Sequence, residues 1–250
     1  ELGIPLTSVY DTLIYQKVDG SFVAGLAERW EVSGDGLVYT FYLRHDVKFH
    51  DGTPFDAQAV QFNLGRIVNP ETKSQKAKGM LGPYDHTEVA DPYTAKVYLQ
   101  QAYAPFLDSM SQVYVGMASP AAVQQWGADY QLHQVGTGPF MFKEYVPQDH
   151  LTLVRNPDYN WAPEFARHTG PALLDQVVFR ILPEAATRFT AFETGEIMIV
   201  SEPPALDAIA IADSGKATIQ TFAQPGIPAI LMINATKAPT DNVNVRKAMI

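Results

Sequence analysis

The sequence contains no cysteine among its 250 residues. This absence excludes disulfide bonds, thiolate metal sites and cysteine nucleophiles. Histidine is scarce, and its six copies show no His-x-x-x-His pair or other metal-ligand spacing. These histidines are His45, His50, His86, His133, His150 and His168. We therefore expect no metal site and no cofactor.

Basic residues are outnumbered, since 18 Lys and Arg stand against 27 Asp and Glu and give a formal net charge of −9. A nucleic-acid-binding protein takes most of its affinity from a basic face, and docking on anionic lipid also needs positive charge. We expect no nucleic acid partner and no docking on anionic lipid.

Long apolar runs are also missing, and no segment has the apolar length of a membrane span. The opening segment ELGIPLTSVYDTL has neither the basic nor the apolar region of a signal peptide. The closing segment NVNVRKAMI resembles the start of a helix. We expect that a signal segment is absent from this chain and that the chain is a fragment of a longer protein.

Short alternating runs predict β-strands between helical patterns, as in YTFYLR, where Tyr39, Phe41 and Leu43 share one face. The other predicted strands cover 96–100, 150–156, 176–182, 217–222 and 229–234. Because strands and helices do not alternate regularly, the pattern indicates a mixed α/β fold and not a simple doubly wound sheet.

Three helix starts carry similar signals. Thr53-Pro54 and Ser119-Pro120 each offer a hydroxyl N-cap followed by proline, and Pro183-Glu184 precedes another helical run. Gly127 and Gly195 stand where the C-caps of the later helices are expected. The first signal predicts a helix from Pro54 to about position 68, with Thr53 as its cap.

The segment KFHDGTPFDAQAVQFNLGRI raises the question of whether His50 and Asp51 carry out chemistry. Neighbouring residues on an extended chain point apart, so the two form a poor acid–base pair. HDGT has the composition of a turn in which Gly52 takes a positive φ. The residues after it place Ala57, Val60, Leu64 and Ile67 on one helical face. We interpret the stretch as architecture.

Other catalytic and nucleotide-binding motifs are missing. VGTGPF, residues 135–140, contains two glycines but lacks the rest of a phosphate loop or dinucleotide fingerprint, and Pro139 removes a backbone donor. The sequence has no G-x-S-x-G nucleophile elbow. We expect no catalytic residue.

Several long motifs resemble the family 5 extracellular solute-binding proteins of ABC importers, which include peptide- and nickel-type binding proteins. The segment AERWEVSGDGLVYTFYLRHDVKFHDGTPFDAQAV, residues 27–60, carries the clearest resemblance. The resemblance extends, in the family's order, to five further segments: VYDTLI, VGTGPFMFKEY, LTLVRNPDYNW, the run over 173–200 and the run over 232–249.

The resemblance implies a periplasmic-binding-protein-like lobe I with a mixed sheet, inside an incomplete two-lobe fold. Residues 1–10 and 137–228 correspond to an incomplete core subdomain of lobe I. Residues 11–136 correspond to a subdomain inserted into it, and residues 229–250 to the start of lobe II.

Family members capture a ligand between their lobes, so the resemblance also implies candidate ligand-binding residues. Two segments, 73–81 and 111–119, match the cleft-lining segments of the family by position. From them and from the N-terminus we take as candidate site residues Lys76, Gly79, Met80, Gln112, Tyr114, Gly3 and Ile4. Lysine suits an anionic group, methionine and tyrosine give apolar contact, and glutamine binds a peptide backbone.

The implied function is capture of a peptide-like or other small solute and its delivery to the transmembrane subunits of an ABC permease. The implied location is extracytoplasmic, either periplasmic or anchored at the cell surface, and the implied full-length state is a monomer. Two alternatives remain open at this stage: a hydrolase-like enzyme using His50 and Asp51, and a ligand sensor without transport.

Overall fold

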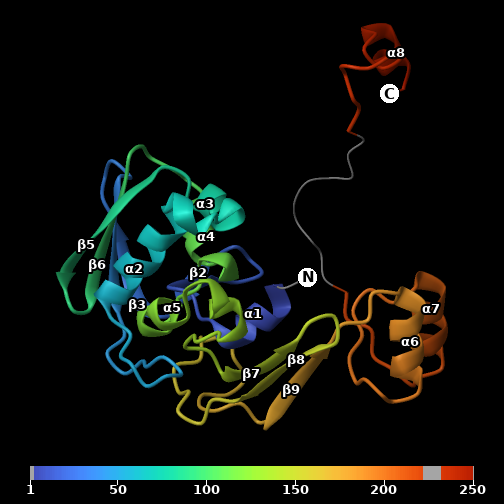
Figure 1. Ribbon diagram of the computed structural model, residues 1–250, viewed down its shortest axis with the longest axis horizontal. Helices are drawn as coiled ribbons and strands as arrows, with labels where there is room; N and C mark the ends of the chain where they lie inside the picture. The colour runs from blue at the N-terminus through green and yellow to red at the C-terminus, as the bar shows by residue number, and fades with distance from the viewer. Residues whose placement is uncertain (1–2, 222–231, 250) are drawn as a thin grey trace. The chain divides into compact units, whose positions relative to one another are not determined.

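The computed structural model describes residues 3–221 and 232–249, which fall into two compact units over residues 1–181 and 182–250 (Figure 1). The helices of the first unit are α1 (Gly3–Val9), α2 (Ala57–Val68), η1 (Pro70–Thr72), α3 (Gln75–Leu81), α4 (Phe106–Met110), η2 (Val113–Val115), α5 (Pro120–Trp126) and η3 (Gly127–Leu132). Its strands are β1 (Ile14–Gln16), β2 (Phe22–Ala24), β3 (Ala27–Val32), β4 (Val38–Leu43), β5 (Tyr84–Asp91), β6 (Thr94–Leu99), β7 (Phe140–Val146), β8 (His150–Arg155) and β9 (Gln176–Arg180). The second unit contains α6 (Ala185–Glu193), α7 (Ala205–Asp213) and α8 (Val243–Ala248).

A four-stranded antiparallel sheet in the order β3-β4-β6-β5 forms one side of the first unit. Alternate residues of β4 and β6 are buried, including Phe41 and Val97, which are both fully buried. Helix α2 packs on this inner face, as Figure 1 shows, and buries the predicted stripe of Ala57, Val60 and Leu64. The strands predicted at 39–44 and 96–100 are confirmed.

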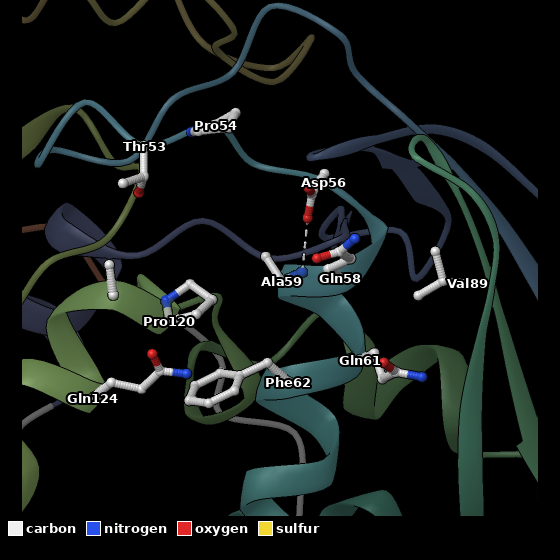
Figure 2. A pocket seen from close by; sticks show the side chains of 11 residues that line it. Thr53, Pro54, Asp56, Gln58, Ala59, Gln61, Phe62, Val89, Pro120 and Gln124 are labelled. Carbon is white, nitrogen blue, oxygen red and sulfur yellow. Dashed lines mark hydrogen bonds between the residues drawn. The ribbon is translucent and has the colours of Figure 1, made fainter.

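The start of α2 corrects the prediction for Thr53 and Pro54. The helix begins at Ala57, and its N-cap is Asp56, whose carboxylate accepts from the Ala59 N–H at 2.9 Å (Figure 2). Pro54 lies in a β-bridge with Lys48. The cause is the fully buried Phe55, whose N–H donates to the Val47 carbonyl at 3.1 Å. Burying this ring keeps the backbone extended until Asp56.

The other helix signals are confirmed. Ser119 caps α5 by accepting from the Ala122 N–H at 3.2 Å, with Pro120 as the first helical residue. Helix α6 follows Pro183-Glu184 directly. Gly127 and Gly195 adopt the left-handed φ values of +50° and +77° that end α5 and α6.

A three-stranded sheet in the order β7-β8-β9 is antiparallel and confirms the strands predicted at 150–156 and 176–182. Residues 217–221 and 232–234 are not in strands, so those parts of the remaining two predictions are wrong; Phe222 and residues 229–231 lie outside the described residues. A strand needs a neighbour for its backbone groups, and these segments have none in the described structure. Every described strand pair is antiparallel, whereas the expected mixed sheet would need a parallel pair.

The chain leaves the region of α1 and β7 after position 10 and returns to it at position 137. The Asp11 side chain links these two points of the chain. Its buried carboxylate accepts from Thr137 Oγ1 and from Trp161 Nε1, each at 2.9 Å. Tyr15 donates to the other carboxylate oxygen at 2.6 Å. One buried acidic side chain therefore holds three separate segments together.

The glycines of VGTGPF, Gly136 and Gly138, lie where their backbone packs closely against the backbone of Ser8 and Val9. A Cβ on Gly136 would lie 2.0 Å from the Val9 carbonyl oxygen, and one on Gly138 would lie 2.6 Å from that of Ser8. The Gly138 N–H donates to the Val9 carbonyl at 2.9 Å. These glycines permit close backbone packing, which explains the motif without a phosphate.

Candidate functional site

Helix α3 contains three of the predicted site residues. Its small apolar face is buried and holds the helix in position. Ala77 and Leu81 are buried, whereas Lys76 and Gly79 are exposed and Met80 is half-buried. Ser109 Oγ at the end of α4 donates to the Met80 carbonyl at 2.7 Å, which satisfies a carbonyl at the C-terminal end of the helix. The helix position is thus fixed from inside while its outer face stays accessible.

The η2 turn and its N-cap provide two more, Tyr114 and Gln112. Val115 is buried beneath the turn, and the Met117 N–H just after it donates to the Asp11 carbonyl at 3.0 Å. Tyr114 is half-buried against the main core, and Gln112 is half-buried at the N-cap of the turn. The buried Val115 and the Met117 hydrogen bond hold η2 in place.

The two elements meet through Lys76 and Tyr114. The Lys76 ammonium lies 3.6 Å from the centroid of the Tyr114 ring, within the range of a cation–π interaction. The resemblance predicted these two residues separately, and the structure places them in contact. Helices α3 and α1 both contact η2.

The remaining predicted residues fit the same surface to different degrees. An added Cβ on Gly79 would meet nothing within 4 Å, so the backbone there is open. The side-chain amide of Gln112 has no hydrogen-bond partner among the described residues. Gly3 and Ile4 form the start of α1, and the side chain of Ile4 lies outside the described structure.

The local charge of the α3 segment is opposite to that of the whole chain. Lys73, Lys76 and Lys78 lie within residues 72–84, and this stretch contains no Asp or Glu. Residues 109–119 contain no charged side chain. A positive surface in a chain of net charge −9 favours anionic ligands.

His50 and Asp51 hold loops together and use separate partners. The His50 imidazole bonds to the Gly138 carbonyl at 2.9 Å through Nε2 and accepts from the Gly136 N–H at 3.3 Å through Nδ1. Burial lowers the pKa of His50, against the opposing effects of the Gly138 carbonyl and of the Asp11 and Asp51 charges. The ring is therefore neutral in its structural role.

Asp51 accepts hydrogen bonds from Ser119 Oγ and from the N–H and hydroxyl of Thr53. Burial opposes ionisation, but these hydrogen bonds outweigh it and keep the pKa of the Asp51 carboxyl below its usual range. Gly52 between the two residues has the expected positive φ of +84°. The turn prediction is confirmed.

A groove of about 560 Å³ lies between α2 and α5, and none of the predicted site residues is among the residues that line it (Figure 2). Phe62 of α2 lies toward Pro120 and Gln124 of α5, whereas Gln58 and Gln61 line the groove on the side of Val89. The polar residues that line this groove form no spaced motif, so the sequence alone gives no signal for it. Gln61 is already engaged, since its amide donates to the Thr87 carbonyl at 2.6 Å.

Neither a metal centre nor a membrane span is found in the part of the chain that the structure describes. No group of three or more His, Cys, Asp or Glu side chains there is arranged to hold a metal ion. No helix within the described ranges is long and apolar enough to cross a bilayer.

The fold resembles solved structures of periplasmic binding proteins, MoaA and DppA among them. MoaA of A. tumefaciens R10 in complex with mannopinic acid aligns with a TM-score of 0.83 at 27% identity, over 98% of this chain and 49% of that one. DppA of Helicobacter pylori in complex with the peptide STSA aligns with a TM-score of 0.70 at 29% identity, over 82% of this chain and 43% of that one. Both are periplasmic binding proteins, so the predicted mixed α/β fold with partial coverage is confirmed.

Sequence comparison gives the same family. The glutathione-binding protein GsiB of Salmonella paratyphi A is 34% identical over 225 residues, which make up 90% of this chain and 42% of that protein. The chain thus spans less than half the length of such relatives. Residues 21–250 match the profile of the bacterial extracellular solute-binding proteins, family 5, middle region, and members of this family are binding proteins and not enzymes. The chain therefore belongs to the family 5 extracellular solute-binding proteins.

Proposed function

We propose that this chain is part of the solute-binding component of an ABC importer and that it captures a small peptide-like solute. The observation that carries the proposal is the contact between Lys76 and Tyr114, which joins two segments expected to line a ligand cleft. Family membership supports the class of activity. The solute would lie against the surface formed by α3 and η2.

A peptide-like solute suits the chemistry of this surface. The names of the relatives mention glutathione, a peptide and an opine acid, and each of these solutes carries a carboxylate. The Gln112 amide offers both a donor and an acceptor for a peptide group. Met80 adds a polarizable apolar contact that adapts to different side chains.

The proposal includes the domain organisation. Residues 1–10 and 137–228 would form the core subdomain of lobe I, residues 11–136 the inserted subdomain, and residues 229–250 the beginning of lobe II. The hydrogen bond between Asp11 and Thr137 supports the first boundary, because it ties the chain together at the two points where the inserted segment begins and ends.

Binding in the proposed cleft would depend on a second lobe closing over the ligand, as in hinge-type binding proteins. The loaded protein would then deliver the solute to the transmembrane subunits of the permease. This step places the protein outside the cytoplasm, as a periplasmic or surface-anchored monomer.

Isothermal titration tests the proposal with the protein expressed from its complete reading frame. The probes are reduced glutathione, the peptide Ser-Thr-Ser-Ala and mannopinic acid. We expect one of the two peptides to bind at one site with a dissociation constant of about 10 μM or tighter, and to raise the unfolding temperature accordingly. The probe should be recovered unchanged after incubation. Lack of binding by all three probes, or hydrolysis of a peptide, would contradict the proposal.

A further inference from the structure

We infer that Lys76, held on the face of the Tyr114 ring, binds a carboxylate of the solute and gives the site its preference for anionic ligands. This inference rests on the proposed function, because it concerns the same surface. It adds the chemical group that is recognised and the residue that recognises it.

The charge of Lys76 is not neutralised by any carboxylate in the part of the chain that the structure describes. Lys17 pairs with Glu164 at 3.3 Å, and Lys96 lies 4.0 Å from Glu88. Lys76 has no carboxylate within ion-pair distance among the described residues, and its ammonium contacts an aromatic ring instead. An aromatic ring attracts a cation without cancelling its charge, so the ammonium remains available to an anion.

The Lys76 ammonium is also held in place before any ligand arrives. A free lysine side chain loses rotamer entropy when it is ordered. Contact with the ring at 3.6 Å already restricts the side chain. Tyr114 in turn packs on the main core, and Val115 beside it is buried. Because the ordering precedes binding, less entropy is lost when the ligand binds.

The surroundings of the Lys76 ammonium also favour an anion. No acidic residue lies in the sequence between Glu71 and Asp85, so the α3 segment presents only positive charges. Gly79 lies three residues after Lys76, on the same side of the helix, and carries no side chain that would obstruct a ligand. A carboxylate can therefore approach Lys76 beside an open stretch of backbone.

Lys78 provides the matched control, because it is also exposed, carries the same charge and lies on the same helix. Two residues along a helix point in different directions, so Lys78 does not share the Lys76 face. The variants Lys76→Met and Lys78→Met change the net charge equally. Tyr114→Phe keeps the ring, whereas Tyr114→Leu removes it.

The test measures binding of Ser-Thr-Ser-Ala and of its C-terminal amide, and of reduced glutathione and its dimethyl ester, to the protein expressed from its complete reading frame. For the acid that binds the unmodified protein, we expect Lys76→Met to weaken affinity about tenfold or more and Lys78→Met to change it less than about twofold. The corresponding amide or ester should bind the unmodified protein about tenfold more weakly, and Lys76→Met should not weaken it further. Tyr114→Leu should weaken acid binding, and Tyr114→Phe should not.

Each outcome separates this inference from the proposed function. If the unmodified protein binds an acid but Lys76→Met binds it equally well, the carboxylate anchor is wrong and the binding function stands. Equal losses in Lys76→Met and Lys78→Met would assign the effect to overall charge and would also overturn the anchor. If Lys76→Met weakened binding of the acid and of its amide or ester by the same factor, the carboxylate anchor would also be overturned. If the unmodified protein binds none of the probes, the proposed function itself fails. Unfolding temperatures confirm that each variant is folded.

Discussion

Asp11 accepts hydrogen bonds from several separate segments of the first unit. Its carboxylate accepts from Tyr15, Thr137, Trp161 and, at 3.5 Å, Tyr159, and its backbone carbonyl accepts from the Met117 N–H. Burial, together with the Asp11 charge, raises the pKa of Tyr159 beside it. A buried carboxylate with four donors contributes to stability through its partners, because each donor would otherwise lack an acceptor.

We therefore expect Asp11→Asn to lower the free energy of unfolding by about 3 kcal/mol. The amide replaces one acceptor oxygen with a donor group, so a hydroxyl or indole N–H of the network loses its acceptor. Asp46→Asn is the matched control, since Asp46 is exposed, and it should change stability by less than about 0.5 kcal/mol. Urea unfolding of the chain gives both values; equal stabilities for the two variants would contradict the role of Asp11.

His50 makes a second prediction at the scale of single residues. Its Nδ1 accepts from the Gly136 N–H, and protonation would place two donors face to face. Because burial lowers the folded-state pKa, the unfolded state binds a proton first as the pH falls. The stabilising contribution of His50 is thus fully present above its unfolded pKa of about 6.5 and is lost as the pH falls through the lower folded value.

The measurement is the unfolding temperature of the chain between pH 8 and pH 5. We expect His50→Gln to be less stable than the unmodified chain at pH 8, and we expect this difference to shrink toward pH 5. The exposed His168 gives the control, and His168→Gln should follow the unmodified chain throughout. A constant difference between His50→Gln and the unmodified chain across this range would rule out the titration.

At the scale of elements, the start of α2 shows what local sequence signals miss. Thr53-Pro54 is a good helix start by its residue types, but burial of Phe55 keeps the chain extended past it. Asp56 then caps the helix through Ala59. Local propensity correctly predicts that a helix forms here and which face it buries. Tertiary packing, however, determines the residue at which the helix begins.

Variants of the two cap candidates should show this directly. Asp56→Ala should cost about 1 kcal/mol of stability, as loss of an N-cap does. Thr53→Ala should cost about 0.5 kcal/mol or less, because its hydroxyl only supports the Asp51 turn. Chemical denaturation of both variants makes the comparison. A larger loss for Thr53→Ala than for Asp56→Ala would restore Thr53 as the cap.

The candidate site was predictable only in part. Resemblance located the segments of α3 and η2, but contact between Lys76 and Tyr114 depends on how both pack on the core, and no periodicity in the sequence encodes it. The strands over 150–156 and 176–182 were predictable because they alternate and pair with each other. Residues 217–221 have a similar composition and no partner strand in the described structure, so composition alone gave the wrong answer there.

At the scale of the whole molecule, the two units differ in how much apolar surface they bury. The first contains both clusters of buried hydrophobic residues, whereas the buried hydrophobic residues described in the second are Phe189 and Ala191. Neither α7 nor α8 contributes a buried residue. Met198 and Leu206 are 90% and 82% exposed. Because burial of apolar surface is the main stabilising contribution, the second unit should be much less stable than the first.

Hydrogen exchange should therefore divide the chain near position 182. Amides of β4 and β6 should exchange only through the global unfolding of the first unit, and amides of α6 and α7 should exchange much faster through local opening. Ile67→Val removes one methylene from the inner face of α2 and should lower the opening free energy of β4 and β6 by about 1 kcal/mol. It should leave α6 and α7 unchanged, because their opening does not require the first unit to unfold. Equal protection in both units, or a loss of protection in α6 caused by Ile67→Val, would show instead that the chain unfolds as one cooperative body.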